Sequence, residues 1–284
     1  MPFVDRNEPY IVDVSHGLVV IFKPSGWHTT LREPGDVSVP SWLFEHCDLL
    51  PASALKEAVQ ASVLRIQRAA VDDRQEPDRF QDELGMLYRL DRDTSGILLC
   101  ALERSTMDAM QKAQDGMALT KRYMLICTES DRGVPGSVPE SRHAERALLL
   151  DGLSAGRGMD VASYFRSYGP RGARVACIAS VFASKSKKKI TRALYATRYL
   201  SVREAGAGEY TLPGLPQRAM LVEAEIRKGF RHQIRAHSAW MGLPIVGDAL
   251  YGGADAVRLF LEAFAVILYD GARIAAEWKL YSED

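Results

Sequence analysis

The sequence has no excess of charge of either sign. Its 284 residues include 36 Lys and Arg and 36 Asp and Glu side chains, so the formal net charge at pH 7 is zero. A strongly basic balance, which is the usual electrostatic footprint of a nucleic-acid-binding protein, is therefore missing. If the chain binds nucleic acid, its basic residues must be concentrated locally.

Cysteine is scarce, and the sequence contains no closely spaced pair. The four cysteines, Cys47, Cys100, Cys127 and Cys177, are widely separated and form no CxxC motif. This spacing does not indicate a zinc site, and isolated thiols are typical of a reducing compartment. We expect all four to be small buried hydrophobic residues.

Long apolar runs are also missing. The N-terminal residues carry charges where a signal peptide would need an apolar core, and the longest apolar segment, around residues 259–269, is interrupted by Glu262 and is too short to span a bilayer. We therefore expect a cytoplasmic protein without a membrane partner. With 47% apolar and 25% charged residues, the chain has the composition of a globular protein that needs no disulfide to fold.

The hydrophobic pattern predicts an α+β fold. Short apolar runs predict strands at residues 18–22, 97–102, 122–127, 175–182, 193–202 and 219–226. Helices are predicted from a cap at Ser53 to about residue 70, over 105–115, and over 232–240. Gly-rich stretches at 152–158 and 206–214 predict loops. Few helices between groups of strands favour α+β over a regular βαβ arrangement.

Charged residues gather at positions 87–96, directly before a predicted buried strand. The segment LYRLDRDTSG places Asp91 on a polar loop that ends at Gly96, where glycine permits a backbone turn. Taken alone, such a loop is also typical of a surface turn with solvated charges. Asp93 would share a face with Asp91 if the stretch were extended, which leaves a carboxylate pair for glycoside-type acid/base chemistry as an alternative.

Basic residues gather in a second segment, RKGFRHQIRAH at positions 227–237. Four cationic side chains lie within nine residues of an otherwise neutral chain. On a helix that begins near Arg231, residues 231 and 235 lie on one face, and arginines near a helix start suit phosphate contacts. A solvated basic helix is the alternative interpretation.

Four motifs resemble, in the same order along the chain, those of the RluA-like family of RNA pseudouridine synthases. YRLDRDTSGILL is similar to the family's HRLD-x-x-TSG-LLL, and KGFRHQIRAHSAWMGLPIVGDALYGG is similar to its GR-THQIR-H-A-lG-PI-GD-YG. The early Lys23–Gly26 matches its KP-x-G, and Lys121–Tyr123 matches its K-x-Y. The resemblance covers about residues 18–253, most of the chain.

The resemblance implies a fold, an activity and a set of site residues. The fold is the pseudouridine synthase fold, a mixed and mostly antiparallel sheet with flanking helices and a central catalytic cleft. The activity is isomerisation of specific uridines in structured ribosomal or transfer RNA, with no metal, no organic cofactor and no obligate protein partner. Asp91 corresponds to the essential aspartate, Tyr123 to the active-site tyrosine, and Arg235 to the arginine that pairs with the aspartate. Neighbouring residues are expected to bind the substrate: Arg89, Leu90, Lys121, Arg231, His232 and Gln233.

The chain departs from the family pattern in three places. Tyr88 stands where the family has its first His, which we expect to affect the wall of the cleft. Phe230 stands where the family often has Arg, so a phosphate contact is expected to move to Arg231. About sixty residues separate the first two motifs, which predicts an insertion at about 29–81 within a single catalytic domain, 1–284. Because fewer than twenty residues precede the first predicted strand, we expect no S4 RNA-binding domain.

Two rival functions stay open from the sequence. An RNA-binding homologue that no longer turns over would bind RNA without forming product. A hydrolase of N-glycosidic bonds would use Asp91 together with Asp93 and would release free uracil. The pattern does not identify the RNA, the uridine, the number of target sites or the oligomeric state.

Overall fold

The computed structural model describes residues 3–4, 6–31, 36–51, 53–59, 80, 83–132, 134, 142–179, 190–205, 216 and 218–281. The chain folds as two compact units. Unit 1 comprises Met1–Phe3 and Thr120–Glu262, and unit 2 comprises Val4–Leu119 and Ala263–Asp284. The prediction that they act as one catalytic domain stays a prediction.

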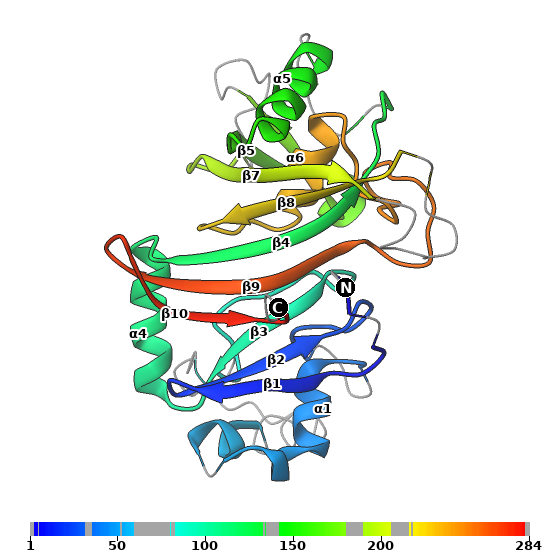
Figure 1. The fold of residues 1–284 in the computed structure, drawn as a ribbon. Coiled ribbons are helices and arrows are strands. Elements are labelled where there is room, and N and C mark those ends of the chain that lie inside the picture. Colours follow the sequence, from blue (N-terminus) through cyan, green and yellow to red (C-terminus); the bar gives the residue numbers. More distant parts are fainter. Residues whose placement is uncertain are drawn as a thin grey trace. The chain divides into compact units, whose positions relative to one another are not determined.

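Unit 2 is built around three antiparallel strands. β1 (Tyr10–Ser15) pairs with β2 (Leu18–Lys23), and β2 pairs with β3 (Ser95–Ala101), as Figure 1 shows. Every residue of β2 and β3 is buried, because both strands are continuous apolar runs. β9 (Leu261–Asp270), most of which belongs to this unit, pairs antiparallel with β10 (Arg273–Lys279).

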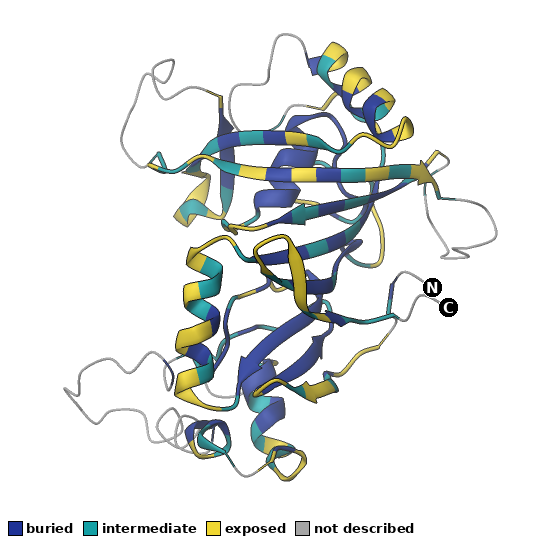
Figure 2. Ribbon diagram, turned by 60° about the vertical axis from the view of Figure 1, so that its left-hand side comes forward, coloured by how far each residue is buried: buried dark blue, intermediate teal, exposed yellow. Residues whose placement is uncertain are grey.

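The helices of unit 2 follow local sequence signals. α1 (Val39–Glu45) begins after Ser38, whose Oγ accepts a hydrogen bond from the Ser41 amide at 3.2 Å. A short 3-10 turn, η1 (Cys47–Leu49), follows it. α4 (Arg104–Asp115) buries Met107 and Met110 and exposes its opposite face (Figure 2).

Unit 1 contains a five-stranded antiparallel sheet. Its order is β4 (Leu119–Cys127), β8 (Met220–Ile226), β7 (Tyr195–Glu204), β5 (Met159–Tyr168) and β6 (Arg174–Ile178). A 3-10 turn, η2 (Pro170–Gly172), joins β5 to β6. α5 (Arg142–Ser154) and α6 (Gln233–Trp240) both contact strands of this sheet. All eight residues of α6 are buried, so this helix is enclosed by its unit (Figure 2).

Most of the predicted elements are confirmed. The apolar runs form β2, β3, β4, β6, β7 and β8, and the two later helices are α4 and α6. The helix after Ser53 is present over residues 54–59, and the Lys56 amide donates to Ser53 Oγ at 3.4 Å. The rest of that helix lies in 60–79, which is outside the described residues, as are 32–35 and 81 of the predicted insertion and the loop predicted at 206–214.

The loop predicted at 152–158 is confirmed for residues 155–158 and is wrong for 152–154. α5 continues to Ser154 through the glycine-rich stretch that begins at Gly152. Gly152 is required for packing rather than for a turn, because a Cβ there would lie 2.9 Å from Met159 Sδ. β1, β5, β9, β10, α1 and α5 were not predicted. β9 lies in the longest apolar segment of the chain, which Glu262 interrupts, whereas the apolar residues of the other elements are too few or too interrupted to stand out from the surrounding sequence.

Three of the four cysteines are buried, as expected. All four are free; Cys100, Cys127 and Cys177 are buried, whereas Cys47 is half-buried. Burial raises the pKa of the Cys100 and Cys177 thiols to about 12, so both stay protonated at neutral pH. Among the described residues, no helix has the length and apolar character needed to cross a bilayer.

Candidate active site

The loop that carries Asp91 is a tight turn fixed to a second turn far away in the sequence. The Thr94 amide donates to the Asp91 carbonyl oxygen at 3.1 Å, which closes the turn. The Gly26 amide donates to the Arg92 carbonyl oxygen at 2.9 Å, and Ser25 Oγ donates to the Asp93 carbonyl oxygen at 2.7 Å. The KPSG motif therefore holds the backbone of the aspartate loop in place, although 66 residues separate Gly26 from Arg92.

This geometry corrects one premise of the rival hydrolase. Asp91 and Asp93 would point to the same side only on an extended backbone. The segment is a turn instead, and the strand β3 begins at Ser95. The spacing of two residues therefore gives no reason to regard the two carboxylates as a catalytic pair.

Lys23 supports the aspartate loop from within the unit. Its side chain is fully buried, and its Nζ donates to the carbonyl oxygens of Pro24, Trp27 and Arg92, each at 2.9 Å. Burial lowers the pKa of Lys23 to about 7, while the nearby charges of Asp91 and Asp93 act to raise it. The protonated lysine thus lies within electrostatic range of the candidate catalytic carboxylate.

The residues before Asp91 are also fixed by hydrogen bonds. Thr29 Oγ1 donates to the Leu90 carbonyl oxygen at 2.9 Å and accepts from the Leu90 amide at 3.2 Å. Leu90 is buried, whereas Arg89 is exposed. Tyr88, the residue that replaces the family's first His, donates its hydroxyl to the Ile97 carbonyl oxygen at 2.9 Å. Tyr88 therefore ties the loop to β3 from its partly buried position.

Strand β4 places Lys121 and Tyr123 on one face and Arg122 on the other. Lys121 and Tyr123 are buried, as expected for alternate residues that face the interior of a sheet. Burial lowers the pKa of Lys121 to about 8. Arg122 lies 3.7 Å from Glu223 and 3.5 Å from Glu225 of the neighbouring strand β8. The lysine and the tyrosine of the K-x-Y motif therefore lie on the same buried face of β4.

Arg235 is held by a carboxylate of the second motif to which the sequence assigned no role. Its Nε and one Nη donate to the two oxygens of Asp248, both at 2.7 Å, and both side chains are buried. This is a bidentate pair, the most directional contact that an arginine forms with a carboxylate. The guanidinium also lies 5.5 Å from the ring centre of Tyr251. The orientation of Arg235 is therefore fixed within unit 1.

The start of α6 differs from the prediction. The helix begins at Gln233, and His232 before it is in the left-handed region with φ of 55°. Arg231 thus lies outside the helix, so the predicted shared helical face of residues 231 and 235 is wrong. The Arg231 guanidinium donates to the carbonyl oxygen of Gly172 instead. Clustering of basic residues in sequence did not reveal this turn.

Gln233 and His232 both make specific contacts at this turn. Gln233 Oε1 accepts from the Phe230 amide at 2.9 Å, and its Nε2 donates to the Ala196 carbonyl oxygen at 2.8 Å. His232 Nδ1 lies 3.1 Å from the hydroxyl of Tyr251. Gln233 therefore closes the turn and joins it to β7. The substrate-binding roles of both residues stay predictions.

Phe230 has a structural reason to depart from the family pattern. Its ring stacks on Phe165 with a centroid distance of 4.9 Å and an angle of 2°, and it lies 5.1 Å from Tyr195. Aromatic pairs of this kind stabilise packing beyond simple burial. An arginine at this position would break the stack, so the departure belongs to the packing of unit 1.

His237 lies within the same packed region and is neutral. It is fully buried, with Nε2 2.9 Å from Ser163 Oγ and Nδ1 2.8 Å from Thr197 Oγ1. Burial lowers the pKa of His237 to about 3. The neutral ring joins α6 to strands β5 and β7, so this histidine has a positioning role.

Two arginines of α5 hold the far end of α6. Arg142 donates to the carbonyl oxygens of Ala239 at 2.6 Å and Arg132 at 3.0 Å. Arg146 donates to the Gly242 carbonyl oxygen at 3.3 Å. The Ala239 and Gly242 carbonyls belong to the last turn of α6 and the residues just beyond it, and each also accepts a backbone amide, so the arginines add charged donors at the negative end of the helix.

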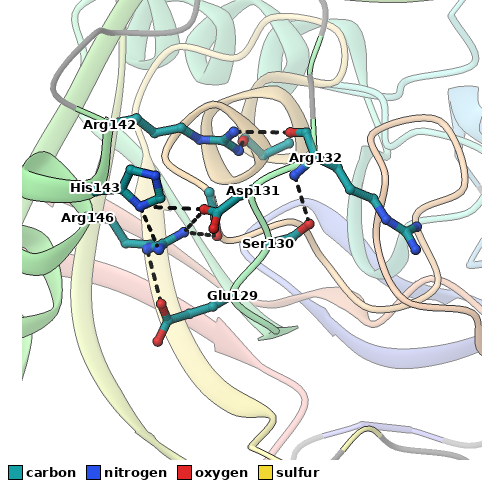
Figure 3. A network of polar contacts seen from close by, with 9 residues as sticks. Glu129, Ser130, Asp131, Arg132, Arg142, His143 and Arg146 are labelled. Carbon is teal, nitrogen blue, oxygen red and sulfur yellow. Dashed lines mark hydrogen bonds and ion pairs between the residues drawn. The ribbon is translucent and has the colours of Figure 1, made fainter.

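The same arginines also reach the segment that follows β4. Arg146 lies 3.1 Å from Glu129 and 3.0 Å from Asp131, both largely exposed carboxylates (Figure 3). Gly242, which has φ of +79°, leaves room for this arrangement, because a Cβ there would lie 2.6 Å from Arg146 Nη1. α5 thus fastens the ends of the two elements that carry Tyr123 and Arg235.

The candidate site residues are divided between the two units. Asp91, Arg89 and Leu90 belong to unit 2, whereas Lys121, Tyr123, Arg235 and the turn at 231–233 belong to unit 1. The predicted pairing of Asp91 with Arg235 and the predicted central cleft stay predictions. Among the described residues, no group of three His, Cys, Asp or Glu side chains is arranged to hold a metal ion.

A family profile described as RNA pseudouridylate synthase matches residues 17–240. The chain belongs to this family. The match includes the aspartate loop, β4 and α6, and it confirms the resemblance inferred from the four motifs.

Curated relatives with the same family name match over part of their length. The tRNA pseudouridine synthase C of Vibrio vulnificus is 28% identical over 189 residues, which is 65% of this chain and 64% of the relative. The ribosomal large subunit pseudouridine synthase C of Haemophilus influenzae is 29% identical over 192 residues, which is 64% of this chain and 46% of the relative. The chain thus spans about half to two thirds of the length of these two relatives.

A solved structure has the same fold. The human RNA pseudouridylate synthase domain containing 1 superposes with a TM-score of 0.54 and 16% identity over 97% of this chain and 84% of that protein. The predicted fold, an α+β pseudouridine synthase fold with a mostly antiparallel sheet and flanking helices, is therefore confirmed.

Proposed function

We propose that the chain isomerises uridine to pseudouridine in RNA and that Asp91 is its catalytic carboxylate. The observation that carries the proposal is the aspartate turn, which the KPSG motif and Lys23 hold in one conformation. Membership of the RNA pseudouridylate synthase family supports the reaction type. A carboxylate on a rigid turn has the defined position that covalent or electrostatic catalysis requires.

The reaction exchanges one bond for another on the same nucleotide. The bond between C1′ of the ribose and N1 of uracil breaks, the base turns, and a bond forms between C1′ and C5. The hydrogen on C5 leaves as a proton to solvent, and N1 gains one. An ionised Asp91 acts in this sequence as a nucleophile or as the anion that stabilises the cationic sugar.

The remaining site residues would prepare the substrate and the carboxylate. Arg235 would keep Asp91 ionised, and its buried fork with Asp248 supports this role by fixing the guanidinium. Tyr123 would stack on the uracil after the nucleotide has left its helix or loop. Arg89, Leu90, Lys121, Arg231, His232 and Gln233 would surround the bound nucleotide and its phosphates.

The substrate class is structured ribosomal or transfer RNA. The names of the two relatives support this class, because one is a tRNA pseudouridine synthase and the other a ribosomal large subunit pseudouridine synthase. We propose the cytoplasm as the place of the reaction, which is consistent with four free thiols. The chain would act without an obligate protein partner.

Analysis of the reaction products tests the proposal. The protein is incubated with transcripts of ribosomal and transfer RNA, and the RNA is then digested to nucleosides and separated. We expect pseudouridine in place of uridine and no free uracil. Free uracil with an abasic RNA would indicate the hydrolase instead, and unchanged RNA despite tight binding would indicate a homologue that does not turn over. Either result would contradict the proposal.

A further inference from the structure

Two segments of unit 1 concentrate positive charge in a protein that has no net charge. Residues 161–179 contain three arginines and no Asp or Glu, and residues 226–247 contain four Lys or Arg and again no Asp or Glu. A protein without net charge can bind a polyanion only where its positive charges are clustered locally, as they are in these two segments. The sequence does not indicate that the two segments meet.

The structure brings these segments together. The Arg231 guanidinium donates to the carbonyl oxygens of Gly172 and, at 3.5 Å, Arg174. A second link runs through Tyr251, whose hydroxyl accepts from the Val175 amide at 2.8 Å and lies 3.1 Å from His232 Nδ1. The turn before α6 is therefore attached to the β5–β6 hairpin at two points.

The attachment forms a surface that we call the basic surface. It consists of two cations on the β5–β6 hairpin and three on the turn before α6, together with two tyrosines: Arg171, Arg174, Arg227, Lys228, Arg231, Tyr168 and Tyr195. Four of the cations are exposed, and Arg174 is half-buried. Within the described part of the chain, none of the five forms an ion pair with a carboxylate. The four exposed cations can therefore contact a ligand from solvent.

Aromatic rings lie between these cations. The Arg174 guanidinium is 5.2 Å from the ring centre of Tyr168, and Lys228 Nζ is 5.4 Å from that of Tyr195. Tyr168 is 41% exposed, so part of its ring is open to a stacking partner. Exposed cations with interleaved aromatic side chains are the pattern by which proteins hold unpaired nucleotides.

Arg171 adds a separate observation. It has φ of 51° inside η2, the left-handed region that favours glycine, and it lies between Pro170 and Gly172. A long cationic side chain at such a position costs backbone free energy that glycine would not. A contact between this side chain and a ligand would offset that cost.

We propose that the basic surface binds the phosphates of an unpaired RNA strand next to the target uridine, with a base stacked on Tyr168. The proposal rests on the proposed function and adds the part of the substrate that unit 1 would recognise. The cations neutralise phosphates without reading sequence, and the tyrosine favours unpaired over paired nucleotides because only an unstacked base offers its face. This surface increases affinity for RNA and leaves the chemical step unchanged.

Salt-dependent RNA binding by charge variants tests the surface. The probe is a labelled single-stranded oligouridylate of about 12 nucleotides, within the usual range of site sizes. The double variant Arg171→Gly/Arg174→Ala is compared with Arg157→Ala/Arg273→Ala, which removes two other exposed cations and so matches the change in net charge. Because glycine suits the backbone at 171, the first substitution is expected to leave the thermal midpoint unchanged or to raise it.

The expected result is at least a tenfold rise in the Kd for RNA for the Arg171/Arg174 variant and little change for the control. The slope of log K against log salt should become shallower by about 0.7 for each phosphate that the variant no longer neutralises. Equal affinity and equal slope in both double variants would overturn the proposal. So would weaker binding with an unchanged slope, because a change in the number of neutralised phosphates must alter it.

Tyr168 and turnover provide independent readouts. Tyr168→Ala should weaken RNA binding at least about fivefold, whereas Tyr168→Phe should bind as the wild type does, because the ring is retained. In the isomerisation assay, the Arg171/Arg174 variant should show a raised KM and an unchanged kcat. A lowered kcat would assign these arginines to the chemical step and contradict the proposal. Failure of the proposed function is distinct, because the wild type itself would then form no pseudouridine.

Discussion

In unit 2 a buried lysine stabilises the loop that carries Asp91 through hydrogen bonds. In unit 1 two arginines and a carboxylate hold the helix that carries Arg235. Lys23 donates to three backbone carbonyls, and its pKa is lowered to about 7 by burial. Asp248 holds Arg235, and Arg142 and Arg146 hold the end of α6. Arginine does not lose its proton at any pH a protein tolerates, but a buried lysine does.

The difference implies that the two halves of the candidate site respond differently to their environment. In unit 2, Lys23 changes charge near neutral pH, so the electrostatic field at Asp91 depends on pH. In unit 1 the arginines keep their charge at all relevant pH values, and their effect depends on the buried acceptor to which each one donates. Substitutions in the two units separate these two kinds of support, beginning with the largest effect.

Removal of the charge on Asp248 should have the largest effect. Asp248→Asn leaves Arg235 as a buried charge without its carboxylate, which should lower the free energy of unfolding by about 3–5 kcal/mol. The rate of isomerisation should fall by about 100-fold, because the guanidinium loses its fixed position. Chemical denaturation and single-turnover rates measure both quantities.

A matched double variant separates the effect on stability from the effect on activity. Arg235→Met/Asp248→Leu replaces the buried pair with apolar side chains and should recover most of the stability that Asp248→Asn removes. It should not recover activity. Recovery of both would mean that Arg235 is needed only for folding.

Lys23 should make stability depend on pH above neutrality. The folded state releases the proton of Lys23 near pH 7, while the unfolded chain keeps it up to the ordinary lysine pKa of 10.5. The unfolded state therefore binds more protons than the folded state between pH 7 and pH 9, so the free energy of unfolding should rise with pH over this range, by on the order of 2 kcal/mol from this group. Denaturation of the wild type and Lys23→Met at several pH values measures it. Identical slopes in the two proteins would show that Lys23 is not the titrating group.

Arg142 should matter through the end of α6. Arg142→Ala removes a charged donor from the Ala239 carbonyl oxygen and should lower the free energy of unfolding by about 2 kcal/mol. His143→Ala, a neighbouring substitution at a side chain that is 70% exposed, is the control and should have little effect. If both variants lose equal stability, α5 does not hold α6 through Arg142.

His237 should act in the opposite pH window and with the smallest effect. Because its folded pKa is lowered from 6.5 to about 3, its contribution is fully present above pH 6.5 and declines as the pH falls. Between pH 6.5 and 5.5 we expect a decrease of about 1 kcal/mol in the wild type that His237→Phe does not show. A variant with the same acid slope as the wild type would exclude this group.

Short motifs and apolar runs predicted much of this molecule. The six predicted strands and the helix at the second basic segment formed because each is a continuous apolar or periodic pattern. Asp91, Tyr123 and Arg235 could be named by position because their motifs are contiguous in sequence. The elements that escaped prediction, such as α5 and β5, bury residues with the expected period, but several of these buried residues are polar or small: Arg142, Arg146 and Gly152 in α5 and Ser163 in β5.

The contacts that position the site could not be predicted, because they join distant parts of the chain. Nothing local indicates that Gly26 bonds to Arg92 or that Arg231 bonds to Gly172. Asp248 was visible in a motif, but its role depends on a fork formed only after α6 has packed. The left-handed backbone at His232 likewise moved the start of α6 away from Arg231.

The central claim is that Asp91, and not Asp93, carries the chemistry. RNA labelled with tritium at uridine C5 is incubated with the wild type, Asp91→Asn and Asp93→Asn in single-turnover reactions, because formation of the new C–C bond releases that hydrogen to water. The account predicts release by the wild type and by Asp93→Asn, and none above background by Asp91→Asn with its thermal midpoint and RNA affinity retained. Release by Asp91→Asn at the wild-type rate, or its absence in Asp93→Asn alone, would contradict it.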